Sequence, residues 1–290
     1  MTPREPLPDA TVPGTVGLTV ANLDRMVGFY TERLGFRVRS RDGDVARLGT
    51  ASRDILILVE RSDAKRAPRA TGLYHFAVLL PSRPALARSL ARLAELRQPL
   101  QGASDHLVSE ALYLADPEGN GIELYRDRPR EEWVRERGDL VMTTLPLDLQ
   151  ALLQEDAGTE GAWSGLPDGT VLGHVHLHVA HIAPAERFYR DHLGMTLTTR
   201  YGEMASFFAA GDYHHHVAVN TWQGVGAPRP PEGARGLREF TLVLPGTEAL
   251  AAAAARLRAA GLTLETTPES VLVRDPSGNA VRLEQPPGSA

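Results

Sequence analysis

A carboxylate and an arginine occupy matching places in two copies of one segment. Residues 116–125 read Asp-Pro-Glu-Gly-Asn-Gly-Ile-Glu-Leu-Tyr, and residues 275–284 read Asp-Pro-Ser-Gly-Asn-Ala-Val-Arg-Leu-Glu. Each copy predicts a tight turn followed by a strand. Glu123 stands on that strand in the first copy, and Arg282 takes its place in the second. A buried carboxylate can bind a metal or pair with an arginine, whereas an arginine cannot bind a metal.

Histidines are the other residues whose type and spacing could do chemistry. Imidazole binds metals and exchanges protons near neutral pH. His75 stands alone on an expected strand, where a histidine is more often a packing residue than a ligand. Histidines that alternate along another expected strand share one face: His174, His176 and His178. In the run 214–216 we expect successive residues to alternate faces, so that His215 points away from its neighbours.

Composition excludes several classes of function. The 290 residues can form two domains, and a net charge of −5 gives no reason to expect nucleic acid or an anionic membrane as a partner. The absence of cysteine excludes disulfides, thiolate zinc sites and cysteine nucleophiles, and is compatible with a reducing cytoplasm. No run of 18 apolar residues and no signal-peptide core are present, so we expect a cytoplasmic protein without a membrane span.

Other segments repeat as well, namely 17–36 with 176–195 and 72–81 with 236–245. Each of these begins as an apolar alternation that predicts a strand, and a helix follows. Gly35 and Gly194 are placed to end two of the helices. The predicted fold class is therefore α+β, built from four βαβββ modules at residues 14–61, 72–127, 173–222 and 236–285. The long segment 128–172 predicts a junction between domains and contains an expected surface helix at 149–153.

The motifs resemble those of a known superfamily. The most specific stretches are residues 72–81, 109–125, 173–179 and 213–222. Together they are similar to the vicinal oxygen chelate (glyoxalase/bleomycin resistance/extradiol dioxygenase) superfamily, and in particular to bacterial catechol 2,3-dioxygenase-type ring-cleaving enzymes. The resemblance covers nearly the whole chain. It implies two half-open mixed-sheet barrels, with an N-terminal domain at 14–127 and a C-terminal domain at 173–285.

The resemblance also implies where metal ligands belong, which is on the first and last strands of paired modules. The first strands offer Thr15, His75, His174 and Glu239, and the last strands offer apolar residues around Leu56, then Glu123, the run 214–216 and Arg282. Only the second and third modules hold a full set of ligands, which is His75, Glu123 and His174. Two histidines and a carboxylate suit Fe(II), with Mn(II) as the alternative. In the fourth module we expect Glu239 and Arg282 to form an ion pair.

Catalytic roles follow from the same resemblance. Tyr113 matches a tyrosine that hydrogen-bonds the substrate oxygen in extradiol enzymes, and His215 matches their acid–base histidine. His106, on the segment before Tyr113, is a candidate for a further substrate hydrogen bond. The sequence departs from the family in one respect, because the site of the best-known extradiol enzymes lies in the C-terminal half. We therefore expect the second and third modules to share one cavity, within a chain or across a dimer.

The sequence thus predicts a non-haem Fe(II) extradiol dioxygenase that acts on a small aromatic diol and O₂, in a homo-oligomer. Two alternatives stay open on the same fold. One is a glyoxalase-type lyase or isomerase that uses Ni(II) or Zn(II), which the single visible carboxylate disfavours. The other is a metal-free protein that binds and sequesters a small aromatic molecule or drug.

Overall fold

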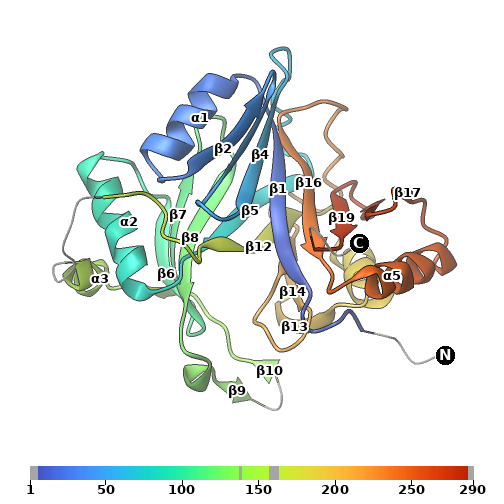
Figure 1. Ribbon diagram of the computed structural model, residues 1–290. Coiled ribbons are helices and arrows are strands. Elements are labelled where there is room, and N and C mark those ends of the chain that lie inside the picture. The colour runs from blue at the N-terminus through green and yellow to red at the C-terminus, as the bar shows by residue number, and fades with distance from the viewer. Residues whose placement is uncertain (1–5, 137–138, 157–162, 287–290) are drawn as a thin grey trace. The chain divides into compact units, whose positions relative to one another are not determined.

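The first two repeats each form a strand, a helix and three further strands. These observations come from a computed structural model that describes residues 6–136, 139–156 and 163–286 (Figure 1). The first module comprises β1 (Val12–Val20), α1 (Leu23–Glu32), β2 (Arg37–Asp42), β3 (Val45–Gly49) and β4 (Asp54–Glu60). The second comprises β5 (Gly72–Leu79), α2 (Arg83–Glu95), β6 (Gly102–Asp105), β7 (Ser109–Ala115) and β8 (Gly121–Asp127).

The last two repeats have the same order of elements. The third module comprises β12 (Val171–His178), α4 (Ile182–Glu186), the π-helix η2 (Arg187–His192), β13 (Thr196–Tyr201), β14 (Ala205–Ala209) and β15 (Val217–Asn220). The fourth comprises β16 (Gly236–Val243), α5 (Thr247–Ala259), β17 (Glu265–Thr266), β18 (Ser270–Arg274) and β19 (Ala280–Glu284). The predicted α+β fold of four βαβββ modules is confirmed.

The segment that joins the second and third modules has its own short elements. They are η1 (Arg130–Glu132), β9 (Arg135–Glu136), β10 (Asp139–Leu140), β11 (Leu145–Pro146) and α3 (Leu149–Asp156). The predicted helix is therefore present as α3, whereas residues 137–138 and 157–162 of the segment lie outside the described residues. Strand β11 adds to a main sheet by pairing antiparallel with β6. None of the helices within the described residues is long and apolar enough to cross a membrane.

Two mixed sheets contain the strands of the four modules. The larger has nine strands in the order β11-β6-β7-β8-β5-β12-β15-β14-β13, so it combines the second and third modules. The smaller has eight strands in the order β17-β18-β19-β16-β1-β4-β3-β2, so it combines the first and fourth. In three modules the first and last strands run parallel, namely β5 with β8, β12 with β15 and β16 with β19. The expected pairing of the second module with the third is therefore present within one chain.

Residue contacts divide the chain into two compact units. One unit comprises Leu18–Lys65 and His75–Gly173, and the other comprises Met1–Gly17, Arg66–Tyr74 and His174–Ala290. The divisions fall inside the continuous strands β1, β5 and β12. The domain limits of 14–127 and 173–285 stay a prediction.

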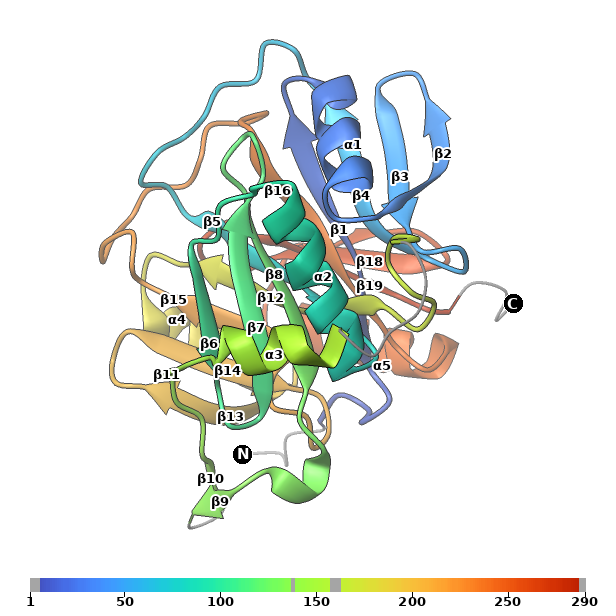
Figure 2. The same cartoon turned by 90° about the vertical axis from the view of Figure 1, so that its left-hand side faces the viewer.

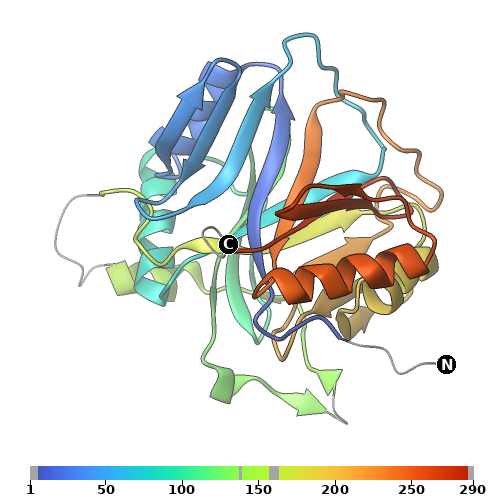
Figure 3. The same ribbon diagram turned by 45° about the vertical axis from the view of Figure 1, so that its right-hand side comes forward.

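Helices cover one face of the sheet within each unit. In the first unit α2 packs against β8, with α3 beside it (Figure 2). Arg83 on α2 holds α3 in place, because its Nη1 atom lies 2.7 Å from Oε1 of Glu155. In the other unit α5 packs against β18 (Figure 3).

Gly35 and Gly194 follow two of the helices with φ of 77° and 91°, as expected of glycines that end a helix.

A buried hydrogen-bonded aspartate opens the last strand of the second module. Oδ1 of Asp116 accepts hydrogen bonds from the backbone N–H groups of Glu118 and Asn120, at 2.9 Å each. Oδ2 accepts from the Asn120 side chain at 2.7 Å and from the Tyr30 hydroxyl at 2.8 Å. Burial raises the pKa of Asp116, although all four donors favour the charged form. Because Tyr30 lies on α1, this turn ties the first module to the second.

The other unit repeats this arrangement residue for residue. Asp275 accepts from the backbone of Ser277 and Asn279, from the Asn279 side chain at 2.9 Å and from the Tyr189 hydroxyl at 3.1 Å. Gly278 has the same φ of 91° as Gly119 in the first copy. The Asp-Pro-x-Gly-Asn segment is therefore a structural turn in both halves.

Removing one donor from this turn should destabilise the protein. We expect Tyr30→Phe to lower the free energy of unfolding by about 1–3 kcal/mol, because the buried carboxylate loses a hydrogen bond. Urea denaturation measures the change. The matched control is Tyr201→Phe, whose side chain on β13 is 58% exposed, and its effect should be below about 0.5 kcal/mol. A Tyr30→Phe variant as stable as the control would contradict the stabilising role.

Candidate metal and catalytic site

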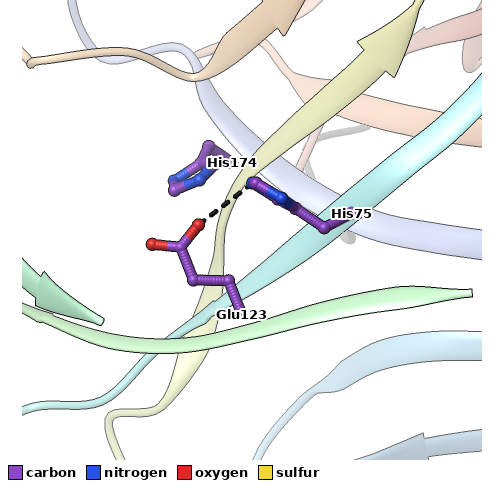
Figure 4. A group of neighbouring side chains, drawn as sticks. All are labelled: His75, Glu123 and His174. Carbon is purple, nitrogen blue, oxygen red and sulfur yellow. Dashed lines mark ion pairs between the residues drawn. The ribbon is translucent and has the colours of Figure 1, made fainter. Parts of the chain in front are cut away.

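Adjacent parallel strands bring His75 and Glu123 together. On β5 and β8 the register pairs His75 with Gly121 and Ala77 with Glu123, so both functional side chains point from the same face of the sheet. Nε2 of His75 lies 3.0 Å from Oε2 of Glu123 (Figure 4). Both side chains are buried, and Glu123 is only 2% exposed. This carboxylate therefore faces an imidazole in the interior, as a metal ligand set requires.

His174 completes the group from β12. Its ligand atom and those of His75 and Glu123 all lie within 4.8 Å of one another, and Figure 4 shows the His174 ring facing the other two side chains. Gly173, the residue before it, is fixed by close packing, since a Cβ there would lie 1.8 Å from the Tyr125 hydroxyl oxygen. A glycine is thus needed where the main chain passes Tyr125 and delivers His174.

The three side chains fit a divalent metal. Two neutral imidazoles and one carboxylate supply two nitrogen donors and one charged oxygen donor, which suits Fe(II) and Mn(II). Within the described ranges 6–136, 139–156 and 163–286, no other set of three or more His, Asp or Glu side chains meets this spacing. The predicted grouping of His75, Glu123 and His174 is confirmed in the structure.

Tyr113 and His106 lie next to this group. Tyr113 on β7 is directly opposite Glu123 on β8, and its ring centroid is 5.6 Å from that of His75. The Tyr113 hydroxyl is 2.7 Å from Nε2 of His106. Two residues predicted to contact substrate are thus hydrogen-bonded to each other beside the expected ligands.

The main chain of Thr143 determines the direction of this hydrogen bond. Its carbonyl oxygen lies 2.7 Å from Nδ1 of His106, and a carbonyl can only accept. Nδ1 of His106 therefore carries a proton, and in the neutral imidazole Nε2 accepts from Tyr113. A hydroxyl oxygen can accept hydrogen bonds as well as donate one. The sequence carries no signal for Thr143, because any residue provides a carbonyl.

His215 lies beside His174. Their ring centroids are 4.1 Å apart, and the Nδ1 atoms of His214 and His215 are 2.8 Å apart. The third histidine of the run, His216, is held by a hydrogen bond from the Ala210 N–H to its Nδ1 at 3.2 Å. All three side chains are buried.

One prediction about this run was wrong. The residues were expected to alternate along a strand, but β15 begins only at Val217, and residues 214–216 form an irregular bend before it. The alternation rule holds only in extended strands, so His214 and His215 are not forced to opposite faces. Both rings consequently lie near His174, with centroid distances of 6.0 Å and 4.1 Å.

The corresponding place in the smaller sheet holds an ion pair. The Arg282 guanidinium donates from Nε and Nη2 to the two carboxylate oxygens of Glu239, each at 2.7 Å, and from Nη1 to Ser270 Oγ at 3.1 Å. The hydrogen bonds to Glu239 raise the pKa of Arg282. The expected ion pair is confirmed. It occupies both carboxylate oxygens of Glu239, which a metal would need as ligand atoms.

Comparison with known proteins settles the family. The profile of the Glyoxalase/Bleomycin resistance protein/Dioxygenase superfamily matches residues 13–124 and 171–283. The chain belongs to this superfamily. It is 46% identical over 272 residues to "Catechol-2,3-dioxygenase" of Bacillus subtilis (strain 168), which covers 92% of this chain and 94% of that protein.

Solved structures agree on the fold of this superfamily member. A candidate dioxygenase of Bacillus subtilis subsp. subtilis str. 168 has a TM-score of 0.66 and 14% identity, over 96% of this chain and 86% of its own. Glyoxalase I from Zea mays has a TM-score of 0.58 and 14% identity, over 95% and 92%. At these identities the likeness concerns the fold alone.

Loss of the carboxylate should weaken metal binding. We expect Glu123→Gln to raise the dissociation constant for Mn(II) or Fe(II) by about 100-fold or more, since even residues that support a metal ligand are worth 10–100-fold. Titration of chelator-stripped protein, with metal content measured by mass spectrometry, provides the readout.

The matched control for that titration is Glu239→Gln. Glu239 holds the equivalent position in the smaller sheet, so its loss should leave metal content unchanged. Retention of metal by Glu123→Gln, together with loss in Glu239→Gln, would place the site in the other sheet.

Proposed function

We propose that this protein is an Fe(II)-dependent extradiol dioxygenase that opens the ring of a catechol beside its two hydroxyl groups, with O₂ as the second substrate. Mn(II) is the alternative metal. The observation that carries the proposal is the buried group of His75, Glu123 and His174, because this is the donor set of non-haem iron oxygenases. The 46% identity with a catechol-2,3-dioxygenase supports the same assignment.

Three protein ligands leave coordination positions open. The chemistry that bound Fe(II) supplies is joint coordination of the catechol oxygens and O₂, with electron density passing from the ring to O₂. All three ligand side chains are buried, and electrostatic interactions are stronger in a buried place than in water. The ligand arrangement therefore serves both reactants at once.

Tyr113 and His106 orient the substrate in this proposal. Because the Tyr113 proton is directed to Nε2 of His106, the Tyr113 oxygen accepts a hydrogen bond from a substrate hydroxyl. The Thr143 carbonyl keeps His106 in the tautomer that this requires. The pair thus holds one catechol oxygen at a defined place next to Glu123, which lies directly across from Tyr113.

His215 is the proposed acid–base residue. The contact between the Nδ1 atoms of His214 and His215 occupies that side of the ring, so proton exchange with substrate takes place at Nε2 of His215. An imidazole titrates near neutral pH and can take a proton from a catechol hydroxyl and return it to the opened ring. His214 positions His215 in this arrangement.

Anaerobic loading with Fe(II), followed by catechol and air, tests the proposal. We expect O₂ consumption and a yellow ring-opened product from wild type and from Glu239→Gln, and neither from Glu123→Gln. Uptake of Zn(II) or Ni(II) to full occupancy without O₂ consumption would favour the lyase or isomerase alternative. Failure to bind any metal would favour a metal-free binding protein. The homo-oligomer stays a prediction, which light scattering can test.

Replacement of His215 should slow the reaction without removing the metal. We expect His215→Asn to lower kcat by about 10²–10⁴-fold, the usual contribution of a positioned acid–base group. Steady-state O₂ consumption measures kcat, and metal content should equal that of wild type. A kcat within threefold of wild type at full metal occupancy would exclude an acid–base role.

A further inference from the structure

The short connection between β6 and β7, which carries His106, has an unusual backbone. Leu107 has a φ of 68°, a left-handed conformation that residues other than glycine rarely adopt. The Leu107 N–H donates to Oδ1 of Asp105 at 2.9 Å, which stabilises the turn. The His106 N–H donates to the Ser109 carbonyl at 2.8 Å. The Asp105 side chain therefore holds the stretch of main chain to which His106 belongs.

Arg128, directly after β8, binds the Asp105 carboxylate with two nitrogens. Its Nη2 atom lies 2.6 Å from Oδ2, and its Nε atom donates to Oδ1 at 3.3 Å. A guanidinium is a rigid fork that matches a carboxylate in this way. Burial alone would raise the pKa of Asp105, but hydrogen bonds from Arg128 and from the Leu107 N–H outweigh it, so this pKa lies below its usual value. Asp105 is therefore charged at neutral pH and fixed in orientation.

Arg128 is itself fixed by its main chain and by a buried carboxylate. Its N–H donates to the Val108 carbonyl at 2.8 Å, and its carbonyl accepts from the indole N–H of Trp133 at 3.0 Å. Its Nη2 atom also lies 3.6 Å from Oε1 of Glu110, which is 3% exposed. Because Val108 belongs to the connection after β6, Arg128 holds that connection with its main chain as well as with its side chain.

These ion pairs lie on the face of the sheet that is opposite Tyr113. Asp105 on β6 is the register partner of Glu110 on β7, and Glu110 pairs with Arg83 of α2 at 2.8 Å. The carboxylates therefore lie on the face that α2 covers. Tyr113 comes three positions after Glu110 on β7, so its side chain points to the other face. His106 thus links an ion-pair cluster on one face with the Tyr113 hydroxyl on the other.

Strand β11 meets β6 at the same residue. Leu145 of β11 is the register partner of Asp105, and Thr143, whose carbonyl lies 2.7 Å from Nδ1 of His106, comes two residues earlier. A shift of Asp105 would therefore move both the main chain of His106 and the strand that brings its acceptor. Hydrogen bonds weaken steeply when their geometry is disturbed. Both contacts of the His106 ring thus depend on where Asp105 is held.

We propose that Asp105 and Arg128 are positioning residues, which keep His106 in the place and the tautomer that accept the Tyr113 hydrogen bond. Both act through His106 and not on the substrate. Without the ion pair, the connection would leave its left-handed conformation, and the His106 ring would separate from Tyr113. The Tyr113 oxygen would then be less well oriented toward a catechol hydroxyl. This inference rests on the proposed function, in which Tyr113 and His106 orient the substrate.

The ring nitrogen signals of His106 in magnetic resonance test the proposal directly. Full-length protein with ¹⁵N-labelled histidines, loaded with diamagnetic Zn(II), should show His106 with Nδ1 protonated and Nε2 unprotonated. The signals are assigned by their absence in His106→Gln. In Asp105→Ala they should move toward the averaged values of exchanging tautomers. The matched control is Asp54→Ala, which removes a carboxylate paired with Arg39 in the smaller sheet and should leave the signals unchanged.

A double-mutant cycle on catechol cleavage by the Fe(II)-loaded enzyme gives a second readout. We expect Asp105→Ala to lower kcat/KM about tenfold at unchanged metal content, mainly through a higher KM, because a misplaced orienting group weakens the hold on the substrate. In the His106→Gln background the same change should alter kcat/KM less than twofold, since residues that act through one another are not additive. A general structural defect would instead lower kcat/KM in both backgrounds.

Conservative variants keep the test informative if Asp105→Ala does not fold. Asp105→Asn retains an acceptor for the Leu107 N–H, and Arg128→Lys retains the charge without the fork. Each should move the His106 signals in the same direction as Asp105→Ala but by less, and each should lower kcat/KM by less than tenfold.

Unchanged His106 signals in all three variants, or an equal loss of kcat/KM in the His106→Gln background, would overturn the inference. If catechol is not cleaved but the signals change as expected, the positioning of His106 stands and the dioxygenase proposal fails. If catechol is cleaved and the signals of the variants equal those of wild type, the positioning role fails alone.

Discussion

A buried carboxylate that must be hydrogen-bonded determines where the last strand of a module begins. Asp116 is 5% exposed and takes four donors from its own turn and from Tyr30. Three of these donors belong to the turn itself, and the fourth, the Tyr30 hydroxyl, joins the turn to helix α1 in the folded state. That contact sets the start of β8 and, through the register of β8, the place of Glu123. A residue of the turn thus positions a candidate metal ligand.

The order of the strands then determines which modules bring the candidate metal ligands together. The nine-stranded sheet joins the second and third modules, and it contains His75, Glu123 and His174. The eight-stranded sheet joins the first and fourth, where Glu239 and Arg282 neutralise each other through two short hydrogen bonds. One set groups a carboxylate with two imidazoles, which suits a divalent cation, and the other supplies its own cation. The two sheets thus hold different chemistry at equivalent places, an ion pair in one and a candidate metal site in the other.

Residues outside the repeated pattern refine the site. The Thr143 carbonyl, from the connecting segment, sets the tautomer of His106 and hence the direction of the Tyr113 hydrogen bond. Strand β11 explains how this segment reaches the site, because it pairs with β6 two residues after Thr143. Trp222, two residues after β15, has its ring centroid 5.2 Å from that of His176. The repeats hold the metal ligands, while these additions shape what surrounds them.

The sequence by itself determined the modules, the turns and the ligand types, because periodicity and turn chemistry are local. It also indicated which modules lack ligands, since Arg282 cannot replace a carboxylate. Only the tertiary structure decided the geometry of His214 and His215, because the strand begins at Val217 and local alternation does not extend into the bend before it. The role of Thr143 was equally beyond the sequence, since a backbone carbonyl is present at every residue and only folding brings this one to within 2.7 Å of His106.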